Sequence, residues 1–167
     1  MLKKRIGQVI FSFFVFALLL SGCRKPTAVV KHEGPEQVVR EAIETLVQAD
    51  ATRYAELLDI PESSLDAAWK IQAFQKQTKR MVRKFARQTR RRGGLKSVDL
   101  AEEGIKYTHM VSHEDGSVTF EPTTFANSVD GDTAEVTVTI TYGNGSADAA
   151  KDFRLIKKKG SWLLKIE

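Results

Sequence analysis

Residues 130–142 read DGDTAEVTVTITY, a glycine turn followed by ten residues in which apolar and polar side chains alternate. Successive residues of an extended chain point to opposite faces, so the alternation puts one set of side chains in a core and the other outside. The apolar set is Val136, Val138, Ile140 and Tyr142, and the polar set is Glu135, Thr137, Thr139 and Thr141. The pattern predicts a strand from Thr133 to Tyr142 with one buried face, which is typical of an antiparallel sheet.

Further strands are expected before this one, because turn sequences rich in glycine and aspartate recur at hairpin spacing. One strand is expected within residues 95–111, with a break at Gly104. Another is marked by Val118 and Phe120, and Pro122 limits it to a sheet edge or a bulge, since proline cannot donate to a neighbouring strand.

The residues that precede the sheet repeat their apolar side chains with the period of a helix. Pro35 opens a first helix, because proline at the first helical position gives up no hydrogen bond. A second, shorter helix is expected over residues 52–58, with Thr52 as its cap. A third is expected from Ser63 or Ser64 to about Arg92, where Gly93-Gly94 ends it.

The chain closes on a predicted hairpin of residues 153–158 and 162–166. Trp162, Leu164 and Ile166 are in phase with each other, so we expect them on its inner face. The predicted helices precede an antiparallel meander in the chain, and this order predicts an α+β fold. In this single domain, residues 35–167, the N-terminal helices pack on one face of a curved antiparallel sheet.

The third predicted helix is strongly basic on one side. Eleven basic and no acidic residues fall between Lys70 and Lys96. At about 100° per residue, eight of them fill an arc opposite the apolar side chains. The basic arc is Lys76, Lys79, Arg80, Arg83, Lys84, Arg87, Arg90 and Arg91, and the apolar arc is Ile71, Phe74, Met81, Val82, Phe85 and Ala86.

Two interpretations of this basic arc stay open. It could dock the domain on an anionic surface, such as phospholipid, lipopolysaccharide phosphate or an acidic envelope protein. It could also be a solvated face that balances the ten acidic residues of the segment 97–150, which contains one lysine.

The amino terminus is predicted to be an export signal of residues 1–22. Its basic cluster, Lys3-Lys4-Arg5, precedes an apolar run of about 12 residues, shorter than the roughly 20 that cross a bilayer. Leu20-Ser21-Gly22-Cys23 then resembles the lipobox of bacterial lipoproteins. The resemblance implies cleavage before Cys23, a diacylglyceryl group on its thiol, and an acyl chain such as palmitate on the new amino group. An uncleaved anchor helix is the alternative.

Processing at Cys23 would change what the rest of the chain can do. Cys23 is the only cysteine, so the lipidated chain keeps no thiol for a disulfide or for catalysis. Loss of the three leading basic residues lowers the formal charge from +5 to +2, and we expect no nucleic-acid partner. Residues 23–34 are expected to be a tether. Arg24, where an aspartate would retain the protein in the inner membrane, favours the periplasmic face of the outer membrane in a diderm organism.

The remaining chain resembles small bacterial lipoproteins of uncharacterised function in the nuclear-transport-factor-2-like superfamily of cone-shaped α+β domains. The resemblance rests on GGLKSV (residues 93–98), DGDTAEV (130–136) and KGSWLLKI (159–166), after a lipobox and two or three helices. It implies a ligand site at the mouth of the cone, between the helices and the concave face of the sheet. The superfamily includes enzymes, ligand binders and scaffolds, so the resemblance implies no particular activity.

Candidate pocket residues are the side chains that this cone would turn inward: Trp69, Tyr107, His109, Tyr142 and Trp162. His109 is in phase with Tyr107, but no carboxylate at a suitable spacing accompanies it, so we expect no catalytic residue. His32, His109 and His113 lack the spacing of a metal site, and no glycine-rich phosphate cradle precedes a helix. Neither a metal nor a cofactor is expected.

The sequence therefore favours a non-catalytic, membrane-anchored lipoprotein of the cell envelope that binds a ligand or a partner and is oriented by its basic helix. Two alternatives remain open. One is a small hydrolase or isomerase that uses His109 with a tyrosine of the cone. The other is a structural or assembly subunit that pairs through the threonine-rich face of residues 133–142.

Overall fold

A computed structural model describes residues 34–61 and 66–166 of the chain. The chain divides into two compact units, Met1–Val30 and Lys31–Glu167, and every described residue belongs to the second. The predicted export signal, Cys23, nearly all of the predicted tether, and both candidate starts of the third helix lie outside the described residues. Within the described ranges, no helix has the length and apolar character needed to span a membrane.

The first two helices begin with the local chemistry of helix starts. Helix α2 spans Pro35–Gln48 with proline at its first turn, as predicted. Helix α3 spans Ala51–Glu56, and its cap is Asp50, whose side chain accepts a hydrogen bond from the Arg53 backbone N–H at 3.0 Å. The prediction of Thr52 as the cap was therefore wrong. Aspartate and threonine both cap helices, and spacing alone could not distinguish two candidates that are two residues apart.

Helix α4 spans Ala68–Arg91 and ends where the glycine pair predicted. Gly93 and Gly94 take φ angles of 85° and 88°, which residues with a Cβ rarely adopt. The Gly94 backbone N–H then donates to the Thr89 carbonyl at 3.0 Å, which satisfies one of the last carbonyls of the helix.

The sheet has six strands in the order β1-β6-β5-β4-β2-β3. The strands are β1 (Leu58–Asp59), β2 (Leu95–Ser112), β3 (Val118–Thr123), β4 (Thr133–Tyr142), β5 (Lys151–Lys158) and β6 (Ser161–Lys165). All pairs are antiparallel except β1 with β6, where Leu58 lies opposite Leu164. The sheet is therefore mixed rather than purely antiparallel. Leu58, predicted as the end of a helix, instead extends along the last strand.

The break predicted at Gly104 and the edge position predicted from Pro122 both have a counterpart in the sheet. Strand β2 is continuous, but its pairing with β4 is irregular between Leu100 and Ile105, the segment that contains Gly104. Strand β3 contains Pro122 and lies at the edge of the sheet. A short 3-10 helix, η2 (Phe125–Asn127), connects β3 to β4.

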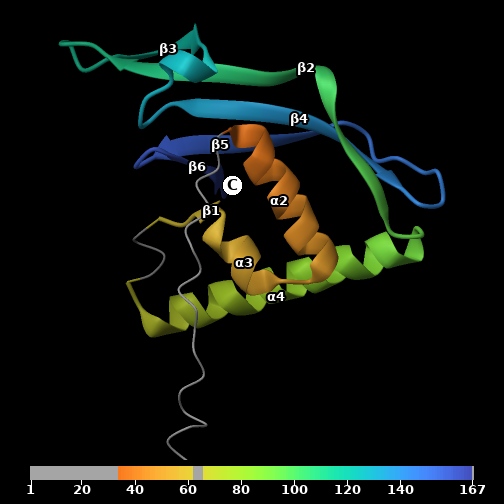
Figure 1. The fold of residues 1–167 in the computed structure, drawn as a ribbon. Coiled ribbons are helices and arrows are strands. Elements are labelled where there is room, and N and C mark those ends of the chain that lie inside the picture. Colours follow the sequence, from red (N-terminus) through yellow and green to blue (C-terminus); the bar gives the residue numbers. More distant parts are fainter. Residues whose placement is uncertain (1–33, 62–65, 167) are drawn as a thin grey trace, which may run out of the picture. The chain divides into compact units, whose positions relative to one another are not determined.

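The core lies between helix α2 and the concave face of the sheet (Figure 1). The predicted inner face of β4 is buried, and it meets the following buried side chains of α2: Val38, Val39, Ala42 and Ile43. Trp162 and Leu164 of β6 are buried as predicted, whereas Ile166 is exposed, because β6 ends at Lys165. Helix α4 packs mainly against α2 and α3 (Figure 1), and most of its side chains are exposed.

Candidate functional site

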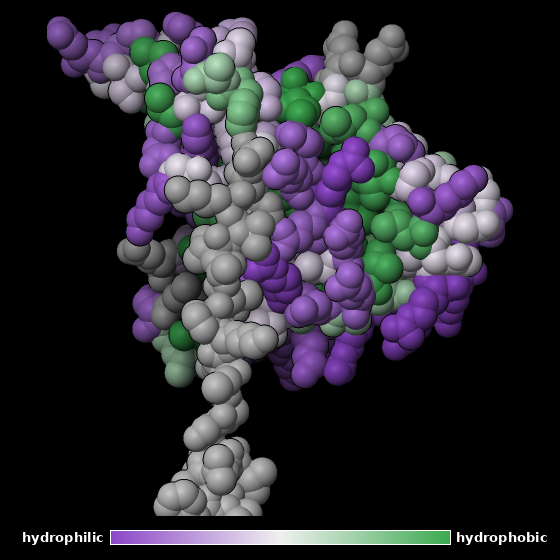
Figure 2. Space-filling model, in the orientation of Figure 1, coloured by the Kyte–Doolittle hydropathy of each residue, from purple (hydrophilic) through white to green (hydrophobic). Residues whose placement is uncertain are grey.

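One long side of α4 is a continuous basic surface. All eight predicted side chains, Lys76, Lys79, Arg80, Arg83, Lys84, Arg87, Arg90 and Arg91, are exposed. None of them forms an ion pair with another residue of the described part of the chain. In Figure 2 a hydrophilic surface covers the underside of the domain, where Figure 1 places α4. We call these eight residues the basic face.

The packing of α4 explains why the basic face points to solvent. The buried residues of the helix are Thr78, Val82, Ala86 and Thr89, which follow each other at intervals of four, four and three residues. Such a row forms a single stripe along a helix. This stripe lies against α2 and α3, so the basic residues on the opposite side can only face outward.

Trp69 lies on the same side of α4 as the basic face and is not enclosed in a pocket. It precedes Arg87 by 18 residues, which is five turns at 3.6 residues per turn, so the two side chains leave the helix in the same direction. Trp69 is 68% exposed, and the Lys70 ammonium lies 5.9 Å from its ring centroid. The prediction that Trp69 lines the cone was wrong. The helical phase that identified the arginines would have placed this tryptophan among them.

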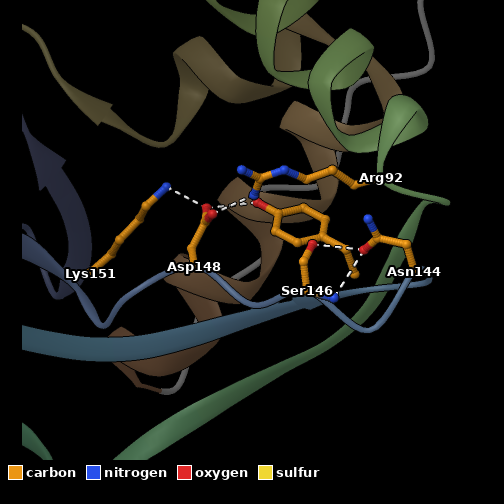
Figure 3. A network of polar contacts seen from close by, with 6 residues as sticks. Arg92, Asn144, Ser146, Asp148 and Lys151 are labelled. Carbon is orange, nitrogen blue, oxygen red and sulfur yellow. Dashed lines mark hydrogen bonds and ion pairs between the residues drawn. The ribbon is translucent and has the colours of Figure 1, made fainter.

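A polar network joins the end of α4 to the loop between β4 and β5 (Figure 3). Asp148 is at its centre and is 16% exposed. One carboxylate oxygen accepts from the Arg92 guanidinium at 2.5 Å, and the other accepts from the Tyr142 hydroxyl at 2.7 Å and from the Lys151 ammonium at 2.8 Å. The Arg92 guanidinium also lies 4.6 Å from the Tyr142 ring centroid.

The environment of Asp148 stabilises its ionised form. Burial alone would raise the pKa of this carboxyl, but hydrogen bonds from Lys151, Arg92 and Tyr142 outweigh burial and hold the pKa well below its usual range. The pKa of Tyr142 is raised, first because the phenol is removed from water and then because it donates to Asp148. Asp148 is therefore ionised at neutral pH.

Backbone contacts fix the geometry of the same network. The Gly143 N–H donates to the Gly94 carbonyl, and the Asn144 N–H donates to the Arg92 carbonyl, each at 2.9 Å. The Asn144 side chain accepts from the Ser146 N–H at 3.0 Å and from its hydroxyl at 2.7 Å (Figure 3). These bonds make Asn144-Gly145-Ser146 a turn between β4 and β5. Sequence reasoning missed Asp148, because Arg92, the partner from α4, lies 56 residues earlier in the chain.

The remaining predicted pocket residues do not meet in one cavity. Tyr107 and Trp162 pack with ring centroids 5.9 Å apart, and Tyr107 is opposite Ala134 on β4. Tyr142 is opposite Leu95, at the other end of the same ladder. The antiparallel register therefore separates side chains that the sequence pattern alone placed on one face.

His109 has the carboxylate partner that the sequence did not reveal. Its Nδ1 lies 2.5 Å from Asp132 Oδ1, and Asp132 is 1% exposed. The other oxygen of Asp132 accepts from the Val129 backbone N–H at 2.8 Å. Asp132 is part of the DGD turn that precedes β4, and a distance of 23 residues hid the pair from spacing arguments. His113, by contrast, contacts Thr119 at 2.8 Å.

A half-open cleft lies between α4 and the last strands. Its volume is about 310 Å³, and its lining is mainly apolar, with Phe74 and Met81 from α4 and Phe153 and Leu164 from the sheet. Tyr54 of α3 also lines it, and burial raises the pKa of that phenol. The cleft is the space that the predicted cone mouth would occupy.

Comparison with known proteins supports the architecture. A crystal structure of a protein from Campylobacter jejuni, described as a candidate NTF2-like (nuclear-transport-factor-2-like) transpeptidase, matches this chain with a TM-score of 0.58. The match covers 80% of this chain and 99% of that one, at 17% identity. The chain has the NTF2-like fold. No protein-family model and no curated protein matches the sequence.

The NTF2-like domain offers three places with distinct chemistry. The basic face attracts anions, since its charges have no acidic partners among the described residues. The apolar cleft can accept a hydrophobic group. The His109–Asp132 pair can hold or transfer a proton, because a buried carboxylate orients the imidazole and leaves its second nitrogen without a partner in the described part of the chain.

Proposed function

We propose that this chain is a lipid-anchored protein of the bacterial cell envelope, and that its NTF2-like domain docks on an anionic membrane surface as a binding module. The observation that carries the proposal is the basic face of α4, with eight exposed cations and Trp69 in line with them. Tryptophan favours the boundary between water and lipid, because its ring is apolar and its N–H is polar. A face that served only to keep the domain soluble would gain nothing from an exposed tryptophan.

The anchor is supported by the sequence Leu20-Ser21-Gly22-Cys23 after a basic and apolar leader. Three acyl chains on Cys23 would hold the protein stably, since one chain alone binds only marginally. The ten residues 24–33 can extend about 35 Å at most, at roughly 3.5 Å per residue. The basic face therefore stays close to the bilayer, and its docking becomes an intramolecular step. Arg24 favours the periplasmic face of the outer membrane.

The energy available for docking is considerable at low salt. Each lysine or arginine near an anionic surface contributes about 1 kcal/mol, and the effect falls off within a Debye length of about 8 Å at physiological ionic strength. Even half of the basic face would thus shift the balance between free and docked domain by several kcal/mol. Docking should weaken as salt is added, because screening acts on exposed charges.

The test uses the two tryptophans of the full chain, reconstituted in vesicles. Trp69 is exposed and Trp162 is buried, so a spin-labelled lipid with its label near the headgroups should quench Trp69 only when α4 lies on the bilayer. We expect strong quenching in vesicles with 30% phosphatidylglycerol, taken as roughly a physiological anionic surface. We expect little quenching in pure phosphatidylcholine, and reversal by high salt.

A matched pair of variants separates the basic face from charge in general. Arg83, Arg87 and Arg90 changed together to glutamine should abolish the quenching. The same number of cations removed elsewhere, with Lys96, Lys159 and Lys165 changed to glutamine, should leave it intact. Equal quenching in neutral and anionic vesicles would contradict the docking proposal. Mass spectrometry of the native protein tests the anchor separately: an intact methionine start without acyl chains would refute it.

A second candidate function is acid–base catalysis by His109, as in a small hydrolase or isomerase. The specific observation in its favour is the buried Asp132 at 2.5 Å, because an oriented imidazole is a suitable general base. The Campylobacter jejuni protein of similar fold is itself described as a candidate transpeptidase. The competing interpretation is structural, since the same bond ties β2 to the turn before β4.

Stability and activity measurements on His109→Gln distinguish the two roles. Glutamine can still donate to Asp132 but cannot accept and release a proton near neutral pH. Catalysis would be lost with little change in unfolding free energy, whereas a structural role would leave any hydrolysis of ester or amide substrates unchanged. Activity equal to wild type in the folded variant eliminates the catalytic candidate.

A further inference from the structure

A cavity of about 370 Å³ lies at the carboxyl end of α4, beside the basic face. Its charged lining consists of Arg91, Arg92, Lys151 and Asp148. Three cations against one carboxylate leave two positive charges around a concave space. A compact anion with two negative charges would neutralise this lining.

The cavity is also lined by Thr89, whose hydroxyl is a hydrogen-bond donor without an acceptor among the described residues. The side chain lines the cavity and is 1% exposed, and its hydroxyl has no hydrogen-bond partner. A threonine within a helix ordinarily donates to a carbonyl of the preceding turn. A buried hydroxyl without a partner is costly, so a ligand oxygen at this position would be stabilised.

The cations of the cavity also keep unused donors. Arg92 gives one terminal nitrogen to Asp148, and Lys151 gives one of its three N–H groups to the same carboxylate. Arg91 has no partner among the residues described, so its whole guanidinium is available. Asp148 holds two of the three cations in place (Figure 3), and this preorganisation lowers the entropic cost of binding an anion.

The carboxyl end of a helix carries partial negative charge, which repels an anion. At the end of α4, however, most of the carbonyls that carry this charge already accept hydrogen bonds. The carbonyls of Gln88 and Thr89 both accept from the Arg92 N–H, and Thr89 accepts from Gly94 as well. The Arg90 carbonyl accepts from the Gly93 N–H. The effect of a helix dipole comes from unsatisfied terminal groups, so these bonds weaken it.

We propose that this cavity binds the phosphate monoester headgroup of a membrane lipid. A monoester carries close to two negative charges near neutral pH and offers three terminal oxygens, which match the net charge and the separate donors of the lining. A diester offers only one charge and two such oxygens. The inference rests on the proposed docking function, because Arg91 belongs both to the basic face and to the lining of the cavity.

The experiment compares two anionic lipids at equal surface potential in the quenching assay with the full chain. Phosphatidic acid supplies the monoester and phosphatidylglycerol the diester. We expect half-maximal quenching of Trp69 at about a tenfold lower concentration of the phosphatidic acid vesicles, the effect of one charge-assisted hydrogen bond. Thr89→Val and Arg91→Gln should each remove this preference. Arg90→Gln is the matched control, since it removes one charge from the same face outside the cavity.

The outcomes separate the inference from the function on which it rests. No quenching with either lipid contradicts membrane docking itself. Quenching at equal concentrations of the two vesicles leaves docking intact and overturns the monoester site. If inorganic phosphate at millimolar concentration abolishes the preference, and binds equally well without vesicles, the cavity is a site for free phosphate and the lipid assignment is wrong. Thr89→Val keeps the test interpretable, because its lost hydroxyl has no partner whose loss could unfold the helix.

Discussion

Asp148→Asn should destabilise the domain by about 2–4 kcal/mol. The substitution preserves shape but removes the charge on which Arg92, Lys151 and Tyr142 converge. Arg92 and Lys151 are 43% and 45% exposed, so each ion pair contributes only about 0.5 kcal/mol. The larger part comes from Tyr142, whose buried hydroxyl competes for the one remaining acceptor oxygen, at about 1–3 kcal/mol if it is left unsatisfied.

The pH dependence of the same variant is a second readout. Because the folded pKa of Asp148 lies below its unfolded value, its charge contributes stability that is fully present above about pH 4 and is lost as pH falls toward the folded pKa. Wild type should therefore lose stability below pH 4 more steeply than Asp148→Asn. The difference between the two proteins should be largest at neutral pH and shrink in acid.

Urea denaturation followed by circular dichroism, repeated from pH 7 to pH 3, measures both effects. Asp152→Asn is the matched control, because Asp152 is an exposed carboxylate on β5 that accepts a hydrogen bond from the Thr137 hydroxyl at 2.6 Å. It should change the unfolding free energy by less than about 0.5 kcal/mol. If Asp148→Asn were as stable as Asp152→Asn at pH 7, the network would not hold α4 to the β4–β5 loop as argued.

Two further predictions test the ends of the helices. Gly93→Ala should cost more than Gly94→Ala, because both need a positive φ but only at Gly93 would the new Cβ meet backbone, 3.0 Å from the Asn144 nitrogen. We expect roughly 1 kcal/mol at Gly94 from strain alone and about 2–3 kcal/mol at Gly93, measured by thermal unfolding; equal losses would place the strain elsewhere. Asp50→Ala should cost about 1 kcal/mol and Thr52→Ala almost nothing, since only Asp50 caps α3, and the reverse order would restore the original assignment.

The parts of the fold that follow from local chemistry were predictable. The bounds of β4 and the burial of its inner face follow from alternation of apolar residues over ten positions, a signal that needs no distant partner. The end of α4 follows from two glycines, and the exposure of the basic face follows from helical phase. Asp50 and Thr52, two residues apart, could both cap α3, so local chemistry alone was insufficient and the prediction was wrong.

The sequence by itself thus determined the order of the elements, their inner faces and the concentration of positive charge on one helix. Only the tertiary structure decided which residues from different elements meet: Asp132 with His109, Asp148 with Arg92, and Leu58 with Leu164. The physical reason is the sequence separation over which the interactions act. Apolar periodicity and helix capping depend on neighbours within one or two turns. The contacts between elements depend on strand register and on the packing of α4, which a short segment of sequence does not specify.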